Sequence, residues 1–504
     1  MKRILVANRG EIAVRVMRTA REMGIETVAV YSEADRDALH VQMADRAVFI
    51  GEPEPAKSYL VIKKIIDAAR ETEADAIHPG YGFLSERAEF AEACAAAGIT
   101  FIGPSAEAMR KLGAKIDAKQ IAVEAGVPVV PGLFEPGATD SELKQAAERI
   151  GYPVLLKASA GGGGRGMRAV RSNDEFDSQI ALAREEAIKA FGDGAMMVEK
   201  LVERPRHIEV QILADTHGNV ACLFERECSI QRRHQKIIEE APSPVMSDEL
   251  WQRMKTAAES LIRKAGYAGA GTVEFMTDFD AKDFYFLEVN ARLQVEHPVT
   301  ESITGIDLVR QQLLIAMGRP MEVSSALMNG DRSAIRGHAI EARIVAEDPA
   351  AGFLPSVGKI IGWAEPQGLG VRFDTGFGAG KEISRFYDSL VAKLIVSADT
   401  REAAINRLSH ALKDTHILGV KTNIAYLIDV LESDEFRRGN TDTGLLGRRF
   451  AEWKLGEDLP LELSALIESA ASPGSGGPAT LSESSRTPAW SQTDGFRIAR
   501  PSHR

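Results

Sequence analysis

The first 110 residues alternate short apolar runs with segments of helical periodicity, and this alternation most constrains the fold. Apolar runs typical of buried strands lie at residues 4–7, 27–31, 47–50, 76–78 and 100–102. Helical patterns lie between several of them, for example at residues 11–23 and 59–72. Strands that alternate with helices predict a parallel, doubly wound α/β sheet. The first turn, Asn8-Arg9-Gly10-Glu11, lacks the glycine fingerprint of dinucleotide-binding folds, so that function is not supported there.

Length and charge narrow the class of protein. A chain of 504 residues corresponds to about three domains of ordinary size. Its net charge of −11 argues against a broad basic surface for duplex nucleic acid. No apolar run is long enough for a membrane helix, and the first run is too short for a signal peptide. Cys94, Cys222 and Cys228 form no C-x-x-C pair, so we expect a cytoplasmic protein without a disulfide framework or structural zinc.

Two further blocks and a tail come after the first. The second block, about residues 115–318, contains a glycine loop, a basic segment and an acidic hairpin. The third, about residues 336–450, has strand-like stretches at 338–345, 359–363 and 390–397 and helical patterns near 401–413 and 423–431. After residue 468 the chain is rich in Ser, Pro, Gly and Ala, which predicts a flexible tail.

The most informative segment predicts a β-hairpin with two opposed carboxylates. Residues 271–276 and 284–292 alternate in polarity around a turn-rich linker. With Ala281 at the centre of the turn, Glu274 faces Glu288, and Glu288, Asn290 and Arg292 share one face. Facing carboxylates destabilise a sheet unless a cation lies between them, and this oxygen-rich set suits Mg²⁺ or Mn²⁺. The alternative is a solvated hairpin face with accidental like charges.

A glycine run between two apolar stretches indicates a phosphate-covering loop. Residues 161–166 follow a strand that contains Lys157, and residues 167–170 are typical of a returning strand. Glycines allow backbone N–H groups to approach phosphate oxygens closely, and Lys157 adds a cation. The strand–loop–strand context does not fit a dinucleotide site, and the Walker pattern is absent. A mobile surface loop is the simpler alternative.

Three other segments carry candidate chemistry. Residues 225–236 include a compact basic cluster that could hold an anion or nucleotide phosphates, or form a solvated charged loop. Glu296 could act as a general base or pair with Arg292, whereas His297 precedes a proline and is expected to be structural. The motif at residues 78–86 follows a strand and could line a ligand crevice or form a rigid turn. Taken singly, Lys115, Glu199 and His207 carry weaker signals.

At these positions the sequence resembles the biotin carboxylase family of ATP-grasp ligases. The matching stretches are residues 7–13, 78–86, 157–167, 232–236, 288–301 and 336–348, within a resemblance that spans about residues 1–450. The resemblance implies a Rossmann-like N-terminal domain at 1–112 and an ATP-grasp domain at 113–330 with a mobile lid at about 130–203. It also implies a C-terminal domain of mixed strands and helices at 331–450 and a flexible tail at 451–504.

The resemblance further implies a reaction and a role for each matching residue. ATP phosphorylates bicarbonate to carboxyphosphate, which yields CO₂ and phosphate, and a deprotonated ureido nitrogen of biotin attacks the CO₂. The implied ATP contacts are Lys115, Lys157, Gly163, Gly164, Glu199, Lys200, Leu201, Val202, His207, Gln231, His234, Glu274 and Glu288. Glu274, Glu288 and Asn290 correspond to the ligands of two Mg²⁺ or Mn²⁺ ions. Lys236, Arg292, Gln294 and Val295 correspond to bicarbonate holders, Glu296 to the base, and Arg343 to the biotin-binding cation.

The same resemblance implies partners. The tetrapeptide that accepts biotin in carrier domains is absent from this sequence, so biotin is expected on a separate carrier protein that also serves a carboxyltransferase. A homodimer is expected, and the chain could be a shortened acyl-CoA carboxylase α subunit. Two alternatives stay open: another ATP-grasp carbon–nitrogen ligase, such as a carbamoyl-phosphate-type enzyme, and a catalytically silent subunit. The presence of Lys236, Glu288, Asn290, Arg292 and Glu296 argues against the silent subunit.

Overall fold

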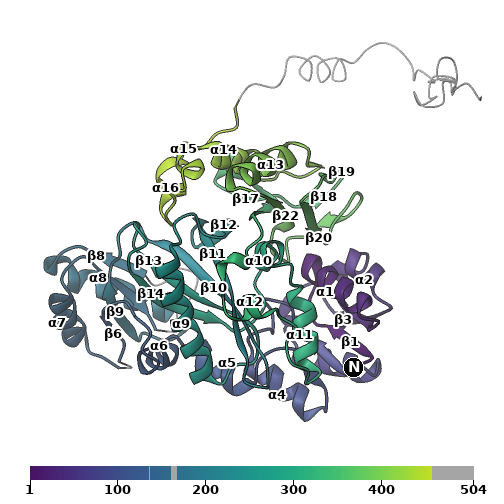
Figure 1. Ribbon diagram of the computed structural model, residues 1–504, viewed down its shortest axis with the longest axis horizontal. Coiled ribbons are helices and arrows are strands. Elements are labelled where there is room, and N and C mark those ends of the chain that lie inside the picture. Colours follow the sequence, from purple (N-terminus) through teal and green to yellow (C-terminus); the bar gives the residue numbers. More distant parts are fainter. Residues whose placement is uncertain (136, 160–166, 457–504) are drawn as a thin grey trace, which may run out of the picture. The chain divides into compact units, whose positions relative to one another are not determined.

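A computed structural model describes residues 1–135, 137–159 and 167–456 of the chain (Figure 1). Residues 1–454 form one compact unit, which contains all the helices and strands of the described chain. The glycine run at 161–166 and the tail from residue 457 lie outside the described residues. Within the described part of the chain, no helix has the length and apolar character needed to cross a lipid bilayer.

The N-terminal block forms the predicted parallel sheet. Its strands are β1 (Arg3–Val6), β2 (Glu26–Ser32), β3 (Arg46–Gly51), β4 (Ala76–His78) and β5 (Thr100–Phe101), in the order β3-β2-β1-β4-β5. The helices of this block are α1 (Gly10–Glu22), α2 (Leu39–Met43), α3 (Ile62–Glu71), α4 (Ala88–Ala96) and α5 (Ala106–Gly113). All four strand pairings are parallel, which confirms the doubly wound arrangement. Helix α3 begins three residues later than predicted, because a 3₁₀ turn at Pro55–Lys57 precedes it.

A small antiparallel sheet carries the strand that contains Lys157. Its strands are β6 (Gly132–Leu133), β7 (Val154–Ala158), β8 (Met167–Val170) and β9 (Met196–Lys200), in the order β6-β9-β7-β8. Helices α7 (Asp140–Ile150) and α8 (Asn173–Phe191) share a core with it, and α6 (Lys115–Glu124) precedes it. The strand–loop–strand context predicted for the glycine run is confirmed, since β7 pairs with β8 on either side of it.

The largest sheet has eight antiparallel strands and runs from the second block into the third. Its strands are β10 (Arg206–Ala214), β11 (Val220–Arg232), β12 (Gln235–Ala241), β13 (Gly269–Thr277), β14 (Phe284–Asn290), β15 (His338–Val345), β20 (Val371–Thr375) and β22 (Leu390–Ala398). Their order is β14-β13-β10-β11-β12-β15-β22-β20. The pairing of β12 with β15 joins the two blocks into one sheet. Helix α9 (Asp248–Ala265) packs against β10 and β11, and α10 (His297–Thr304) and α11 (Leu308–Ala316) come after the β13–β14 hairpin.

The third block adds short strands and helices around that sheet. Its small strands are β16 (Glu347–Asp348), β17 (Leu354–Pro355), β18 (Gly358–Lys359), β19 (Gly362–Ala364), β21 (Glu382–Ile383) and β23 (His416–Leu418). Its helices are α13 (Arg401–Lys413), α14 (Ile424–Glu432), α15 (Asp434–Arg437) and α16 (Leu445–Arg449), while α12 (Ser325–Met328) precedes β15. The single strand predicted at 359–363 is wrong: β18 and β19 pair with different partners, so the chain changes sheet between them.

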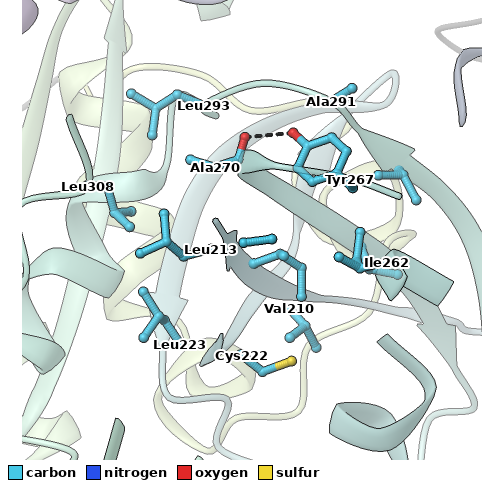
Figure 2. Close-up of a cluster of buried hydrophobic side chains, with 14 of the residues drawn as sticks. Val210, Leu213, Cys222, Leu223, Ile262, Tyr267, Ala270, Ala291, Leu293 and Leu308 are labelled. Atoms are coloured by element: carbon cyan, nitrogen blue, oxygen red, sulfur yellow. Dashed lines mark hydrogen bonds between the residues drawn. The ribbon is translucent and has the colours of Figure 1, made fainter. Parts of the chain in front are cut away.

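Buried aliphatic and aromatic side chains between the large sheet and its helices form the main core (Figure 2). Val210, Leu213 and Leu223 from β10 and β11 pack with Ile262 of α9. Tyr267 is buried among them, and its hydroxyl donates to the carbonyl of Ala270 at 2.8 Å. The core therefore fixes β10 and β11, and these two strands also carry the buried polar residues Glu209 and Arg226.

We expect Leu223→Ala to lower the free energy of unfolding by about 2–5 kcal/mol, because it leaves a cavity in a fully buried site. Leu182→Ala makes the same change on α8, where the side chain is 44% exposed, and should cost no more than about 1 kcal/mol. Urea unfolding followed by far-UV circular dichroism measures both. Equal losses in the two variants would contradict the placement of Leu223 in this core.

Candidate active site

A cavity of about 580 Å³ opens where residues of all three blocks meet. Asn8, Glu11 and Tyr81 line it from loops and a helix of the N-terminal block. Four of the predicted site residues also line it: Lys236, Arg292, Val295 and Arg343. These four come from β12, from the segment after β14, and from β15, so the continuous sheet brings them together.

The ammonium group of Lys236 lies at the centre of three carboxylates. Its Nζ donates to Glu209 Oε2 at 2.5 Å, to Glu296 Oε1 at 2.6 Å and to Glu274 Oε1 at 2.9 Å. An ammonium has three N–H donors, so all of them are taken. Burial disfavours the charged form of Lys236, but the three carboxylates outweigh it and raise the pKa well above its usual value.

Glu296 is ionised and held by two cations. Its Oε1 accepts from Lys236, and its Oε2 accepts from Nη2 of Arg343 at 2.9 Å. Burial alone would raise the pKa of Glu296, yet Lys236, Arg343 and Arg226 hold it well below the usual value. The ion pair with Arg292 that the sequence offered as an alternative is wrong, because Arg292 Nε instead donates to Glu86 at 3.0 Å.

The β13–β14 hairpin places Glu274 directly opposite Glu288, as predicted. The register shifts by one residue between Glu274 and Phe275, however, so the simple symmetric turn around Ala281 is wrong. Phe275 faces Phe286, which leaves Leu287 as the extra residue of a β-bulge. The bulge shifts the register by one residue and brings the two carboxylates into line.

Side chains around Glu274 form a dense polar network. Asn290 Nδ2 donates to Glu274 Oε1 at 2.7 Å, and Gln294 Nε2 donates to the same oxygen at 2.9 Å. The other oxygen, Oε2, lies 3.0 Å from Nε2 of His207. Burial would raise the pKa of Glu274, but Lys236 and His207 hold it well below the usual value. Glu274, Glu288 and the Asn290 amide form an all-oxygen donor set on one hairpin, which fits Mg²⁺ or Mn²⁺.

Arg226 lies beneath this network and hydrogen-bonds two of its members. Its guanidinium is fully buried and donates to Glu209 Oε1 at 2.6 Å and to Gln294 Oε1 at 2.8 Å. Glu209 therefore links Arg226 to Lys236, and Gln294 links Arg226 to Glu274. Because guanidinium donors have a fixed planar geometry, Arg226 fixes the positions of Glu209 and Gln294 relative to each other.

A second cluster surrounds Glu199 on β9. Its Oε2 accepts from Lys157 at 2.6 Å, and its Oε1 pairs with Lys119. Burial would raise the pKa of Glu199, but Lys157 and Lys119 hold it below the usual value. Lys200 points away, since its Nζ donates to the carbonyls of Gly151 and Tyr152 at 2.8 and 3.2 Å.

The remaining predicted ATP contacts are spread over β9, β11 and the turn after β11. Leu201 and Val202 directly follow β9, and the Leu201 N–H donates to the Pro153 carbonyl at 3.1 Å. Gln231 lies on β11 with its amide nitrogen 3.5 Å from Nδ1 of His207. His234 occupies the β11–β12 turn in a left-handed conformation, with φ of 65°. Lys115 begins α6, and its side chain lies outside what the structure describes, as do Gly163 and Gly164.

The structure also bears on three other predictions. The solvated loop offered for residues 225–236 is wrong for its first part, because Glu225 to Ile230 are buried in β11. His297 is structural as expected: it is fully buried, its Nδ1 lies 2.7 Å from the Gln294 carbonyl, and burial holds its pKa well below the usual value. The motif at 78–86 combines both of its predicted roles, since His78 Nδ1 accepts from the Gly80 N–H at 3.0 Å while Tyr81 lines the cavity.

Several polar residues of the site were missed by sequence reasoning. They are Glu209, Arg226, Glu239, Glu341 and Lys119, all buried. Strand alternation from His207 would have singled out Glu209, and alternation from Arg343 would have singled out Glu341. Lys119 lies one helical turn after Lys115. A buried charge inside an apolar strand pattern was the available signal for all except Lys119.

Three features together define an ATP-grasp ligase. They are the small antiparallel sheet β6-β9-β7-β8, the glycine-rich sequence between β7 and β8, and the carboxylates of the β13–β14 hairpin. Three family models match consecutive parts of the chain. The N-terminal domain of biotin carboxylase matches residues 1–109, the ATP-binding domain of the carbamoyl-phosphate synthase L chain matches 114–324, and the C-terminal domain of biotin carboxylase matches 341–448.

Individual relatives agree. A biotin carboxylase of Nostoc sp. is 52% identical over 444 residues, which cover 88% of this chain and 98% of that one. The mitochondrial methylcrotonoyl-CoA carboxylase subunit alpha of Rattus norvegicus is 50% identical over 88% of this chain and 61% of its own length. A crystal structure of a biotin carboxylase–βγ-ATP complex from Campylobacter jejuni is 46% identical, with a TM-score of 0.84 over 89% of this chain and 99% of that one. The chain belongs to the biotin carboxylase family.

Replacing Lys236 with methionine should destabilise the protein in a pH-dependent way. The folded-state pKa values of Glu274 and Glu296 are lowered, so their ionised forms stabilise the wild type above the usual carboxylate range, and this contribution is lost as pH falls. Without the ammonium, these buried carboxylates repel at neutral pH. The Tm difference between wild type and Lys236→Met should therefore be largest near neutral pH and should shrink toward about pH 5.

Thermal unfolding across this pH range measures the effect. Lys63→Met is the matched control, because its side chain is 83% exposed and pairs only with Asp67. A Tm loss in Lys236→Met that does not change with pH would contradict the role of Lys236 as the counter-charge.

Proposed function

We propose that this protein is the biotin carboxylase component of an acyl-CoA or related carboxylase. It uses ATP to activate bicarbonate as carboxyphosphate and transfers the resulting CO₂ to biotin. The observation that carries the proposal is the triad of Lys236, Glu296 and Arg343: Lys236 and Arg343 line the cavity, and both hold the buried Glu296 behind it, next to the Glu274–Glu288 hairpin. Lys236 supplies a cation for bicarbonate, and Arg343 supplies one for the negative oxygen of biotin. The ionised carboxylate of Glu296 can accept a proton.

The binding of bicarbonate makes Glu296 a stronger base. Lys236, Arg292, Gln294 and the Val295 backbone hold the bicarbonate oxygens, and Glu296 accepts its proton. In the free enzyme Glu296 is a weak base, because Lys236 and Arg343 keep its pKa low. A bicarbonate oxygen that takes up a Lys236 donor weakens the Lys236–Glu296 bond of 2.6 Å and raises the basicity of Glu296. Proton removal thus becomes favourable only when the substrate is present.

Arg343 serves the second chemical step. Its Nε and Nη2 donate to Glu239 and Glu296, whereas Nη1 hydrogen-bonds no described residue. Arg343 lines the cavity, and its guanidinium charge stabilises the negative oxygen that forms on biotin when its ureido nitrogen loses a proton. The phosphate released together with CO₂ accepts the ureido proton, and the deprotonated nitrogen then forms the N–C bond to CO₂.

ATP and its metal ions would bind near the hairpin and the small sheet. Glu274, Glu288 and Asn290 would hold Mg²⁺ or Mn²⁺, which would screen the charge of the phosphate oxygens. We assign Lys115, Lys157, Gly163, Gly164, His207, Gln231 and His234 to the phosphates and ribose, and Glu199, Lys200, Leu201 and Val202 to the adenine side. Lys157 reaches the phosphates by giving up its 2.6 Å bond to Glu199, whose charge Lys119 continues to balance.

The proposed assembly is based on the family. Biotin is delivered by a separate carrier protein, and a carboxyltransferase selects the final acceptor. The relatives include a subunit named for methylcrotonoyl-CoA and others named only for biotin, so the acceptor is chosen outside this chain. We further propose a homodimer that acts in the cytoplasm, without nucleic acid or membrane partners.

Bicarbonate-dependent ATP hydrolysis with Mg²⁺ tests the proposal. Free biotin should stimulate the wild type, and Glu296→Ala should lower the stimulated rate by about a hundredfold or more, the size expected for loss of a general base. Glu322→Ala, at a half-exposed carboxylate paired with Arg310 and Arg319, is the matched control and should retain wild-type rates.

The outcomes separate the alternatives. Turnover that does not respond to biotin would favour another ATP-grasp carbon–nitrogen ligase. The absence of any turnover, even with a biotinylated carrier protein, would favour a catalytically silent subunit.

Glu288→Gln should raise the Mg²⁺ concentration needed for half-maximal ATP hydrolysis by about tenfold, because it removes one charged oxygen ligand. Titrating Mg²⁺ and Mn²⁺ at fixed ATP measures the change. Glu347→Gln, which alters a carboxylate that also lines the cavity but lies outside the hairpin, is the control. An unchanged metal requirement in Glu288→Gln would remove Glu288 from the ligand set.

A further inference from the structure

Two buried carboxyl groups, Glu239 and Glu341, lie side by side next to Arg343. Glu239 on β12 is the direct cross-strand partner of Glu341 on β15, and both side chains have no exposed surface. Residues that face each other across antiparallel strands project from the same side of the sheet. Two ionised carboxylates so placed would repel strongly in a buried site, so a stable fold requires that one keeps its proton.

The hydrogen bonds of the two groups are unequal. Glu239 Oε1 accepts from Nε of Arg343 at 2.6 Å and also pairs with Nη2. Its other oxygen, and both oxygens of Glu341, have no hydrogen-bond partner among the described residues. Buried polar atoms are nearly always satisfied, so three neighbouring oxygens without protein partners indicate a shared proton or an ordered water.

The charges around the pair favour the proton on Glu341. The groups that face Glu239 are Arg343, Lys236, Glu296 and Glu341, and those that face Glu341 are Lys393, Arg343, Tyr81, Glu239 and Glu296. Burial raises the pKa of Glu341 well above its usual value, and Lys393 opposes this only in part. Burial also raises the pKa of Glu239, but only to about 7, because its contact with Arg343 compensates more strongly.

We infer that Glu239 and Glu341 form a one-proton carboxyl pair that positions Arg343 for the transfer to biotin, an inference that rests on the proposed function. Glu341 keeps the proton, and Glu239 carries the single negative charge. That charge anchors Nε and Nη2 of the guanidinium and so fixes the position of Arg343 at the wall of the cavity.

The pair also divides Arg343 between two carboxylates. Nη2 of Arg343 contacts both Glu239 and Glu296, the latter at 2.9 Å. When Glu239 is neutral, Glu296 becomes the only anion on this guanidinium, so Arg343 shifts toward the proposed base and away from its position for biotin. Protonation of Glu239 below about pH 7 should therefore weaken the biotin step before it affects ATP binding. Glu341 and Glu239 are positioning residues in this scheme, because neither lines the cavity.

Kinetics with free biotin between about pH 6 and 9 test the inference, alongside ATP hydrolysis that depends on bicarbonate but not on biotin. Glu239→Gln should lower kcat/KM for biotin about ten- to a hundredfold, leave the KM for ATP within about twofold, and abolish the acid-side fall of kcat/KM that we expect for the wild type. Glu239→Asp should restore part of the loss. In Glu341→Gln the amide has the size and the lack of charge of a protonated carboxyl group. Its kcat/KM for biotin should therefore stay within about threefold of the wild-type value.

Infrared spectroscopy gives a readout that does not depend on activity. At neutral pH the wild type should show the carbonyl stretch of a protonated carboxylic acid that Glu341→Gln lacks. The matched kinetic control is Glu240→Gln, the next residue on β12. Glu240 projects to the opposite face, where it contacts His338 at 2.7 Å and Arg401 at 2.6 Å. This variant should keep the wild-type kcat/KM for biotin per folded molecule.

The outcomes separate this inference from the proposed function. A wild type without biotin-stimulated ATP hydrolysis would refute the proposed function. With an active wild type, wild-type biotin kinetics in Glu239→Gln, equal losses in Glu240→Gln, or a protonated-carboxyl band that persists unchanged in Glu341→Gln would each overturn the positioning pair.

Discussion

The contact on which the rest of the structure depends is the ammonium of Lys236 among the carboxylates of Glu209, Glu274 and Glu296. Three buried negative charges would be strongly destabilising without it, since an unpaired buried charge costs about 3–5 kcal/mol. Each carboxylate has a second cation or donor as well, such as Arg226 for Glu209. The sheet can therefore hold these three charges in its interior because each is shared between at least two partners.

This sharing also keeps the site poised for chemistry. The free enzyme already holds Glu296 ionised, so no proton has to leave before bicarbonate binds. In the proposed function, the cations that stabilise the fold are also the groups that bind the substrates. Lys236 and Arg343 would then couple substrate binding to the basicity of Glu296, and a preorganised charge network needs little rearrangement during the reaction.

The sequence predicted the local elements well and the site in part. The parallel sheet of the first block, α13 at Arg401–Lys413 and β15 at His338–Val345 follow from periodicity, which is a local property. The opposition of Glu274 and Glu288 was also predicted, although the reasoning assumed a symmetric turn and the structure uses a bulge at Leu287. Near the turn the pairing lies one residue away from the predicted register, and the bulge at Leu287 shifts it back by one residue, so Glu274 still faces Glu288.

The partners of the charged groups could not be predicted. Arg292 contacts Glu86, about two hundred positions earlier, and Glu239 contacts Arg343 across a strand pairing that joins two sequence blocks. Such contacts depend on strand order, which periodicity does not encode. Glu341 shares a strand face with Arg343, but its pairing with Glu239 depends on the strand order and could not be predicted.

The pairing of β12 with β15 has a consequence for how proteins of this kind can change over time. Because one sheet crosses the boundary between blocks and the cavity draws on all three, a gene break or exchange near residue 330 would separate strands that need each other. We expect an exchange of the whole unit, with joints outside residues 1–454, to preserve the fold better than a joint near residue 330. The rat relative is a longer chain, and the match covers 61% of its length.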